Sequence, residues 1–140
     1  MGGSGEVSMN GIREVFSSFA VDDIERARTF YGEVLGLSVR DVELGIDGAD
    51  VPRGLELPRG TDGRILIYPR AEHEPAEFTV INIVVEDVEA AVDDLIARGV
   101  TFEQYEVPKT DGKGIHRTPE VHPVAWLRDP AGNVISIVEA

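Results

Sequence analysis

The chain reads VFSSFAVDDIERA over residues 15–27 and TVINIVVEDVEAA over residues 79–91. Each copy is an apolar run followed by an acidic turn and the start of a helix. Each residue of the second copy follows its counterpart in the first copy by the same number of positions, as Asp87 follows Asp23. Farther along, GRILIY at residues 63–68 also matches GNVISI at residues 132–137. A repeat of this kind predicts two copies of one supersecondary unit.

Two amphipathic helices are expected, one in each copy of the repeat. Apolar residues recur at helical spacing after Asp23 and predict a helix to about Leu35, ended by Gly36. After Asp87 a second helix with the same apolar stripe is ended by Gly99. The stripe residues are Ile24, Ala27, Phe30, Tyr31, Val34 and Leu35 in the first helix, and Val88, Ala91, Val92, Leu95 and Ile96 in the second.

The remaining apolar and β-branched runs predict strands, separated by Asp-Gly, Pro-Arg-Gly and Pro-Ala-Gly-Asn turns that favour hairpins. The expected strands cover residues 37–42, 54–57 and 64–68 in the first half, and 101–107, 123–128 and 134–139 in the second. The fold class is therefore α+β, with two β-α-β-β-β half-modules at about 12–70 and 77–140. Neither four-stranded sheet can cover its own apolar face, so the halves must pair edge to edge or exchange with a second chain.

Composition limits the classes of function. With 140 residues, 42% of them hydrophobic and 28% charged, the chain has the size and character of one globular domain. Residues 1–10 are rich in Gly and Ser and read as a flexible tail or a cloning remnant. No secretory signal or membrane span is evident, so the expected location is the cytoplasm. The chain has no cysteine, which excludes disulfides and thiolate chemistry but says little about the compartment.

The charge is strongly acidic, with 26 acidic against 13 basic side chains. Such a field repels nucleic acids and anionic membrane surfaces, so neither is an expected partner. A neutral or cationic small molecule is the easier ligand, although an acidic surface also serves solubility alone.

The pattern VxDIExAxxFYxxVLGL at residues 21–37, followed by WxxDPxGN at residues 126–133, resembles the vicinal oxygen chelate superfamily. This family groups glyoxalase I, extradiol dioxygenases, fosfomycin-resistance enzymes and bleomycin-resistance proteins. The resemblance covers nearly the whole chain. It implies a curved, cup-shaped mixed sheet around a small-molecule cavity, with a helix on the outside of each half, and frequently a homodimer.

The resemblance also implies where a metal ion would be bound. Metalloenzymes of the family place ligands on the first strand of each half, here Phe16 and Val80, and on the last strands, here Ile67 and Ser136. A catalytic divalent cation needs about three ligands of His, Glu or Gln type. These four positions lack that set, so no metal or other cofactor is expected.

Other catalytic patterns are weak. His116 and His122 lie in one predicted loop at a spacing that is not specific for zinc, and His73 lies in a polar linker. Solvated histidines are the simpler interpretation of all three. No serine has the Gly-x-Ser-x-Gly context of a nucleophile, and the helix starts carry acids that disfavour phosphate binding.

The positions implied by the resemblance, combined with the alternation of side chains along strands, predict a cavity lining. Trp126 and Tyr68 are expected at its wall or rim, where their rings would stack on a planar ligand. The same side chains could instead fill a closed core. The expected lining consists of Phe16, Ser18, Ile67, Tyr68, Val80, Asn82, Trp126, Val134, Ser136 and, from a loop, His116.

Residues 108–123 show no period and predict a long loop between two strands of the second half. Its positive charge comes from Lys109, Lys113 and Arg117, together with His116 when protonated. Such a loop either closes over an anionic or carbonyl group as a lid or stays solvated.

The leading functional hypothesis is a metal-free small-molecule binding protein that resembles bleomycin-resistance proteins and sequesters an aromatic or cationic natural product such as an antibiotic. The alternative is a lyase, isomerase or dioxygenase that binds a metal through unmatched residues or works without one. His116 or His122 beside an acid such as Glu120 would favour this alternative. A third reading is a structural domain whose cavity is filled.

Overall fold

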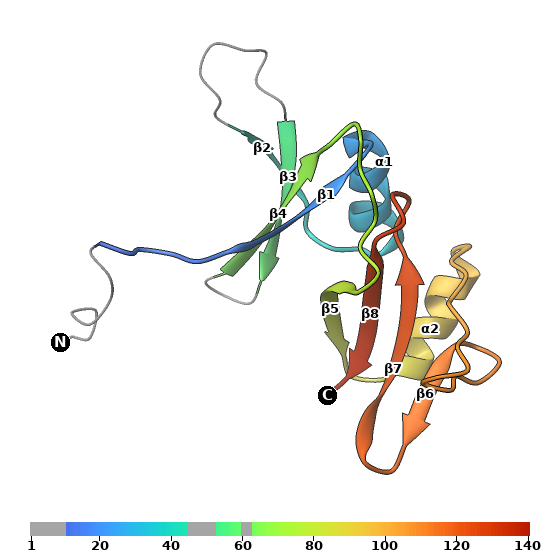
Figure 1. Ribbon diagram of the computed structural model, residues 1–140. Helices are drawn as coiled ribbons and strands as arrows, with labels where there is room; N and C mark the ends of the chain where they lie inside the picture. The colour runs from blue at the N-terminus through green and yellow to red at the C-terminus, as the bar shows by residue number, and fades with distance from the viewer. Residues whose placement is uncertain (1–10, 45–52, 60–62) are drawn as a thin grey trace.

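The computed structural model describes residues 11–44, 53–59 and 63–140, so the expectation of a tail at residues 1–10 lies outside the described residues. Two four-stranded mixed sheets each carry a helix on one face (Figure 1). The predicted α+β fold of two half-modules is confirmed. The elements run in the order β1 (Ser17–Val21), α1 (Ile24–Thr29), η2 (Phe30–Val34), β2 (Arg40–Glu43), β3 (Arg53–Arg59), β4 (Gly63–Pro69), β5 (Thr79–Val85), α2 (Val88–Ala97), β6 (Ile115–Thr118), β7 (Val121–Arg128) and β8 (Val134–Glu139).

Both sheets have the same topology. The strand order is β1-β4-β3-β2 in the first module and β5-β8-β7-β6 in the second. The first strand of each module pairs in parallel with the last one, because a helix crosses over between them, and the other pairs are antiparallel. Among the described residues the two sheets stay separate and do not join into one continuous cup.

Aspartate side chains start both helices, as the repeat predicts. Asp23 is the N-cap of α1 and accepts a 3.1 Å hydrogen bond from the backbone N–H of Arg26. Asp87 caps α2 in the same way, through a 3.1 Å bond from the N–H of Ala90. Each bond satisfies a backbone donor that lacks a partner within the helix, typically stabilising a helix by about 1 kcal/mol.

The first helix differs from the regular α-helix that was expected. Its second part, η2, is π-helical, and Leu35 donates its N–H to the carbonyl of Phe30 at 2.9 Å. The predicted ends of both helices are confirmed, since Gly36 and Gly99 follow them with φ of 75° and 94°. A residue with a Cβ would be strained in this left-handed conformation.

The predicted strand at residues 101–107 is wrong. Most of this segment runs irregularly beside the sheet, with Phe102 buried in the core and Glu103 donating to the carbonyl of Trp126 at 2.8 Å. The fourth strand is β6, which lies inside the predicted loop at residues 108–123. As an edge strand with the sequence Ile-His-Arg-Thr, it buries little apolar surface and so gave a weak signal in the sequence.

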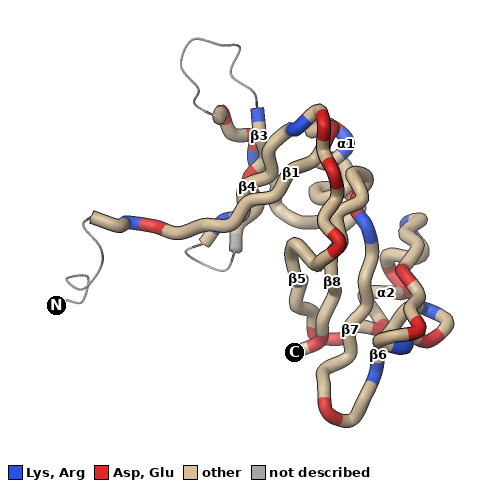
Figure 2. Tube along the Cα trace, viewed as in Figure 1, with Lys and Arg blue, Asp and Glu red and all other residues tan. Residues whose placement is uncertain are grey.

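The helix-covered sides of the sheets form the core, in which Tyr31, Leu55, Ile67, Leu127 and Ile135 are fully buried. The opposite sides of the strands carry most of the polar and half-exposed residues. Figure 2 shows that β5, β7 and β8 are uncharged over most of their length, although acidic residues dominate the chain as a whole. No helix of the described chain is long and apolar enough to cross a membrane.

Polar side chains connect the two modules at the Asp129–Asn133 turn. The hydroxyl of Tyr31 donates to Asp129 Oδ2 at 2.6 Å, and Asn133 Nδ2 donates to the carbonyl of Ala20 at 2.8 Å. Burial, followed by the charge of Asp129, raises the pKa of Tyr31 above its ordinary value, so the phenol is a donor at neutral pH. A second link is formed by Arg98, which donates to the carbonyl of Val34 at 2.8 Å.

Candidate ligand-binding face

The open side of the second sheet carries the candidate site that includes the largest number of predicted site residues. Asn82, Ser136 and Trp126 are in register on β5, β8 and β7, so their side chains form one row across the sheet. The hollow above this row has a volume of about 440 Å³, which is within the usual range for small-molecule sites. We call this surface the aromatic face; it is lined by Asn82, Pro108, His116, Val121, His122, Val124, Trp126, Ser136 and Val138.

The floor of the aromatic face is polar, and its two polar side chains are joined by a hydrogen bond. Ser136 is almost completely buried, at 1% exposure, and its hydroxyl donates to Asn82 Oδ1 at 2.5 Å. This bond uses the donor of the serine and the carbonyl oxygen of the asparagine. The amide N–H groups of Asn82, which is exposed, are therefore left for a ligand.

The wall of the face is aromatic. The Trp126 ring meets Tyr105 edge-on, with centroids 5.5 Å apart and planes at 64°, and His116 lies 6.3 Å from it. His116 is itself held by a contact of 2.7 Å between Nδ1 and the carbonyl oxygen of Lys109. Such rings offer flat surface to a planar ligand.

The structure brings together four of the predicted site residues here: Asn82, His116, Trp126 and Ser136. Sequence reasoning missed Tyr105, because its segment was expected to be a strand. Tyr105 supports the wall through its contact with Trp126. Sequence reasoning also missed five lining residues of the face. Two of these, Val124 and Val138, could have been predicted, since they alternate with core residues along β7 and β8. The missed lining residues are Pro108, Val121, His122, Val124 and Val138.

Three other predicted residues lie at a second hollow, of about 380 Å³, next to the linker between the modules. Ser18, Tyr68 and Val80 line it together with His73. The Nε2 atom of His73 is buried without a hydrogen-bond partner among the described residues, so the expected solvated role is wrong for this nitrogen. Phe16 lies outside this hollow, half-exposed, with the Arg64 guanidinium 4.1 Å from its ring centroid.

The predicted inward orientation of Ile67 is wrong. Ser18 is in register with Leu66, as Asn82 is with Ser136, so Leu66 is the structural counterpart of Ser136. The last strands of the two modules, β4 and β8, are therefore aligned one residue away from the alignment predicted from the sequence. Ile67 has 0% exposure and packs in the helix-covered core, while Val134 is buried at 5%.

This correction leaves the argument about metal ligands unchanged. The four implied positions are now Phe16, Leu66, Val80 and Ser136, and none carries the His, Glu or Gln side chain that a catalytic cation of this type needs. Within residues 11–44, 53–59 and 63–140, no three His, Asp or Glu side chains are grouped closely enough to hold a metal ion.

The open side of the first sheet has a different chemistry. Glu56, at the position equivalent to Trp126, has a side chain only 12% exposed and accepts a 3.0 Å bond from Arg64. Arg40 also pairs with Glu56, and Arg64 reaches Glu14 at 3.2 Å. The hydrogen bond from Arg64 is the main cause that lowers the pKa of Glu56, against the opposing effect of burial. We call these four residues the ionic cluster.

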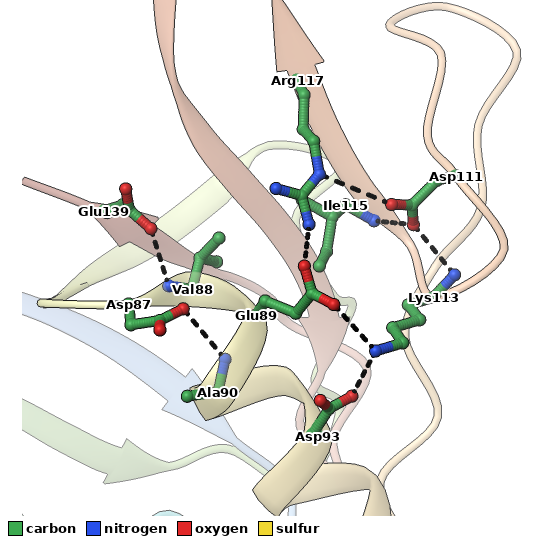
Figure 3. A network of polar contacts seen from close by, with 10 residues as sticks. All are labelled: Asp87, Val88, Glu89, Ala90, Asp93, Asp111, Lys113, Ile115, Arg117 and Glu139. Atoms are coloured by element: carbon green, nitrogen blue, oxygen red, sulfur yellow. Dashed lines mark hydrogen bonds and ion pairs between the residues drawn. The ribbon is translucent and has the colours of Figure 1, made fainter.

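Two of the cations in the predicted loop at residues 108–123 lie against the outer helix. Figure 3 shows Lys113 between Glu89 and Asp93 of α2, at 3.1 and 2.8 Å, with Arg117 2.6 Å from Glu89. Asp111 accepts bonds from the backbone N–H groups of Lys113 and of Ile115, the first residue of β6, and so shapes the turn before β6. The positive charges of Lys113 and Arg117 therefore lie against α2.

Comparison with known proteins agrees with this geometry. Residues 13–137 match the family model described as Glyoxalase/Bleomycin resistance protein/Dioxygenase superfamily. No curated protein sequence matches the chain at a significant level.

Solved structures share the fold over nearly the full length. A member of the glyoxalase/bleomycin resistance protein/dioxygenase superfamily from Sphaerobacter thermophilus has a TM-score of 0.65 at 22% identity, covering 91% of this chain and 98% of its own. TnmS3, an antibiotic binding protein from a Streptomyces species, has a TM-score of 0.63 at 25% identity, with coverage of 94% and 98%. A lactoylglutathione lyase from Agrobacterium tumefaciens has a TM-score of 0.60 at 20% identity, with coverage of 94% and 96%.

Proposed function

Because the chain belongs to the glyoxalase/bleomycin resistance protein/dioxygenase superfamily, we propose that it is a metal-free protein that binds a planar aromatic small molecule. The observation that carries the proposal is the aromatic face, where Trp126 lies in one row across the sheet with the hydrogen-bonded pair of Ser136 and Asn82. This is a flat apolar wall beside a few fixed polar groups, the usual make-up of a small-molecule site.

The positions that carry metal-ligating side chains in the family support binding without a metal in this chain. Phe16, Leu66 and Val80 are apolar, and the hydroxyl of Ser136 is already engaged with Asn82. The strongly acidic charge of the chain favours a neutral or cationic ligand over an anion. The similarity to an antibiotic binding protein is consistent with sequestration of a natural product, which we propose as the biological role.

We further propose that two copies form a homodimer. Both sheets leave one side without a helix, and β1 and β5 end their sheets as edge strands. Such surfaces and edges favour pairing with another chain. Light scattering coupled to size exclusion should give twice the mass of the 15.2 kDa chain, and a monomer at micromolar concentration would contradict this part of the proposal.

An enzyme remains the second candidate, because His116 and His122 both line the aromatic face and a neutral imidazole can act as a base. The described lining of the face includes no Asp or Glu that would complete an acid–base pair. The two histidines therefore support a lyase or isomerase only if one histidine alone can catalyse the reaction.

Ligand screening with metal-free protein tests the proposal. Trp126 is the only tryptophan, so its fluorescence reports this face alone when planar aromatic compounds are added with EDTA. We expect one-to-one binding that EDTA does not weaken and that leaves the compound chemically unchanged. Turnover that EDTA abolishes would overturn the proposal.

A variant pair locates the binding site. Trp126→Ala should weaken binding of the selected compound at least tenfold by calorimetry, since stacking on an aromatic side chain is lost. Phe78→Ala is the comparison variant, because Phe78 is 70% exposed and lines the second hollow instead of the aromatic face. A loss in Phe78→Ala without a loss in Trp126→Ala would show that the compound binds at the second hollow.

A further inference from the structure

The hydrogen-bond partners of His116 define the polarity that a ligand must have. His116 stands on β6 opposite Val124, and its ring lines the aromatic face beside Trp126. One ring nitrogen, Nδ1, lies 2.7 Å from the carbonyl oxygen of Lys109. A carbonyl oxygen can only accept a hydrogen bond, so Nδ1 must carry the proton.

This contact fixes the tautomer of the neutral ring. With the proton on Nδ1, Nε2 has a bare lone pair and acts as a hydrogen-bond acceptor. The Lys109 carbonyl is held in place by a small hairpin, in which Lys109 pairs with Glu106 and Thr110 donates its N–H to the carbonyl of Tyr105 at 3.1 Å. The hairpin that holds the Lys109 carbonyl therefore also fixes Nε2 of His116 as the acceptor of the neutral ring.

Asn82 supplies the complementary group on the other side of Trp126. Its Oδ1 already accepts from Ser136, so its amide N–H groups are the donors that remain for a ligand. The row across β5, β8 and β7 places Asn82 two strands away from Trp126, and His116 lies on the strand beyond. The aromatic wall is therefore flanked by an acceptor and a donor.

From this arrangement, and resting on the proposed function, we infer that the ligand is a planar aromatic molecule with a phenolic or amine hydrogen-bond donor facing His116 and a carbonyl or ether acceptor facing Asn82. A ligand that lacks the donor would cover the Nε2 lone pair without replacing its bond to water. Such unpaired buried groups discriminate strongly between close analogues.

A matched pair of probes tests the inference, namely 6-hydroxy-2-acetonaphthone and its methyl ether. The two share the ring system and the ketone acceptor, and only the first carries a donor. Binding is followed at neutral pH through the indole N–H signal of Trp126 in ¹⁵N-labelled protein, which is unique because the chain has one tryptophan. We expect the phenol to bind about tenfold more tightly than the ether.

The preference should depend on one histidine. In His116→Phe the phenol and the ether should bind equally, and in His116→Gln, which restores an acceptor, part of the preference should return. Arg117→Gln is the control, since Arg117 follows His116 on β6 but pairs with Glu89 of α2, outside the lining of the aromatic face, and should leave the preference intact. Each variant is used only after its amide spectrum shows the native fold.

The possible results separate the inference from the proposed function. If both probes bind the native protein equally, or if His116→Phe keeps the preference, the inference is overturned while aromatic binding stands. If neither probe moves the Trp126 signal, both are overturned. A long-range ¹H–¹⁵N spectrum of the imidazole gives an independent check, because a proton found on Nε2 of the neutral ring would contradict the assigned tautomer.

Discussion

The phenol of Tyr31 and the carboxylate of Asp129, 98 positions apart in the chain, share a hydrogen bond of 2.6 Å in the interior between the two modules. Tyr31 has 0% exposure and Asp129 has 4%. Asp129 also accepts from the backbone N–H groups of Ala131 and Asn133 and from the Asn133 side chain. One buried carboxylate thus ties the helix of the first module to the last turn of the second.

Removing the phenol oxygen should weaken this junction. We expect Tyr31→Phe to lower the free energy of unfolding by roughly 1 to 2 kcal/mol, because a buried carboxylate oxygen loses a donor while its other bonds remain. Urea denaturation measures the change. Tyr68→Phe removes the same atom from a half-exposed residue of β4 and should have little effect. Equal stability of Tyr31→Phe and the native protein would contradict the role given to this bond.

Acid should weaken the ionic cluster. The Glu56 pKa lies below its ordinary value of 4.5, chiefly because of the bond from Arg64. The stability that this carboxylate contributes is therefore present above that value and is lost as the pH falls through the lowered pKa. Glu56→Gln should lower the free energy of unfolding at pH 7 by a few tenths to about 1 kcal/mol, and by less near pH 3.

Denaturation at both pH values, with Glu43→Gln as a control, measures this difference. Glu43 lies on the neighbouring strand β2 and forms no ion pair within the described residues. A penalty for Glu56→Gln that does not change between the two pH values would show that the cluster does not contribute as a charged pair.

Divalent metals should not stabilise the protein. Specific binding at a hundredfold excess over the dissociation constant would add about 2.7 kcal/mol, or several degrees in the unfolding temperature. We expect no such shift when tag-free protein, first treated with EDTA, is heated with manganese, iron, cobalt, nickel or zinc ions. A shift with a single metal would contradict this expectation and make a metal-dependent enzyme the leading candidate function.

The turn before β6 should depend on Asp111. Burial raises the pKa of this carboxyl, but the backbone N–H groups of Ile115 and Lys113 and the nearby Arg117 more than offset burial, so the pKa is lowered overall. Without the carboxylate these amides lose their acceptor, so Asp111→Ala should speed hydrogen exchange of the Ile115 amide about tenfold. Glu120→Ala, in the exposed turn that follows, should leave this amide unchanged, and protection that survives Asp111→Ala would contradict the assignment.

The sequence was sufficient for the parts of the fold that local chemistry determines. Asp23 and Asp87 mark both helix starts, Gly36 and Gly99 mark both ends, and the repeat between them reveals the two modules. The pairing between strands was harder to predict from the sequence. The polar edge strand β6 was missed, and an apparent match of glycines placed Ile67 where Leu66 belongs.

Part of the candidate site could be predicted from the sequence, because side chains alternate between the two sides of a regular strand. Asn82 and Ser136 were predicted from the ligand positions that the family resemblance implies together with strand alternation, and Trp126 from its place on the strand before the Pro-Ala-Gly-Asn turn. Tyr105 was not, since it lies on an irregular segment whose position depends on the contact with Trp126. Nor does any local pattern show that Lys113 and Arg117 turn toward α2, because their partners lie on a distant helix.

Each central strand has one side that packs under a helix and one that does not, and this division has an evolutionary consequence. On β8, Ile135 and Ile137 hold the core while Ser136 and Val138 belong to the aromatic face. Mutations can therefore exchange one set for new chemistry while selection for folding acts on the other. The ionic cluster and the aromatic face occupy equivalent surfaces of the two repeats, so the same strand positions carry charge in one module and aromatic surface in the other.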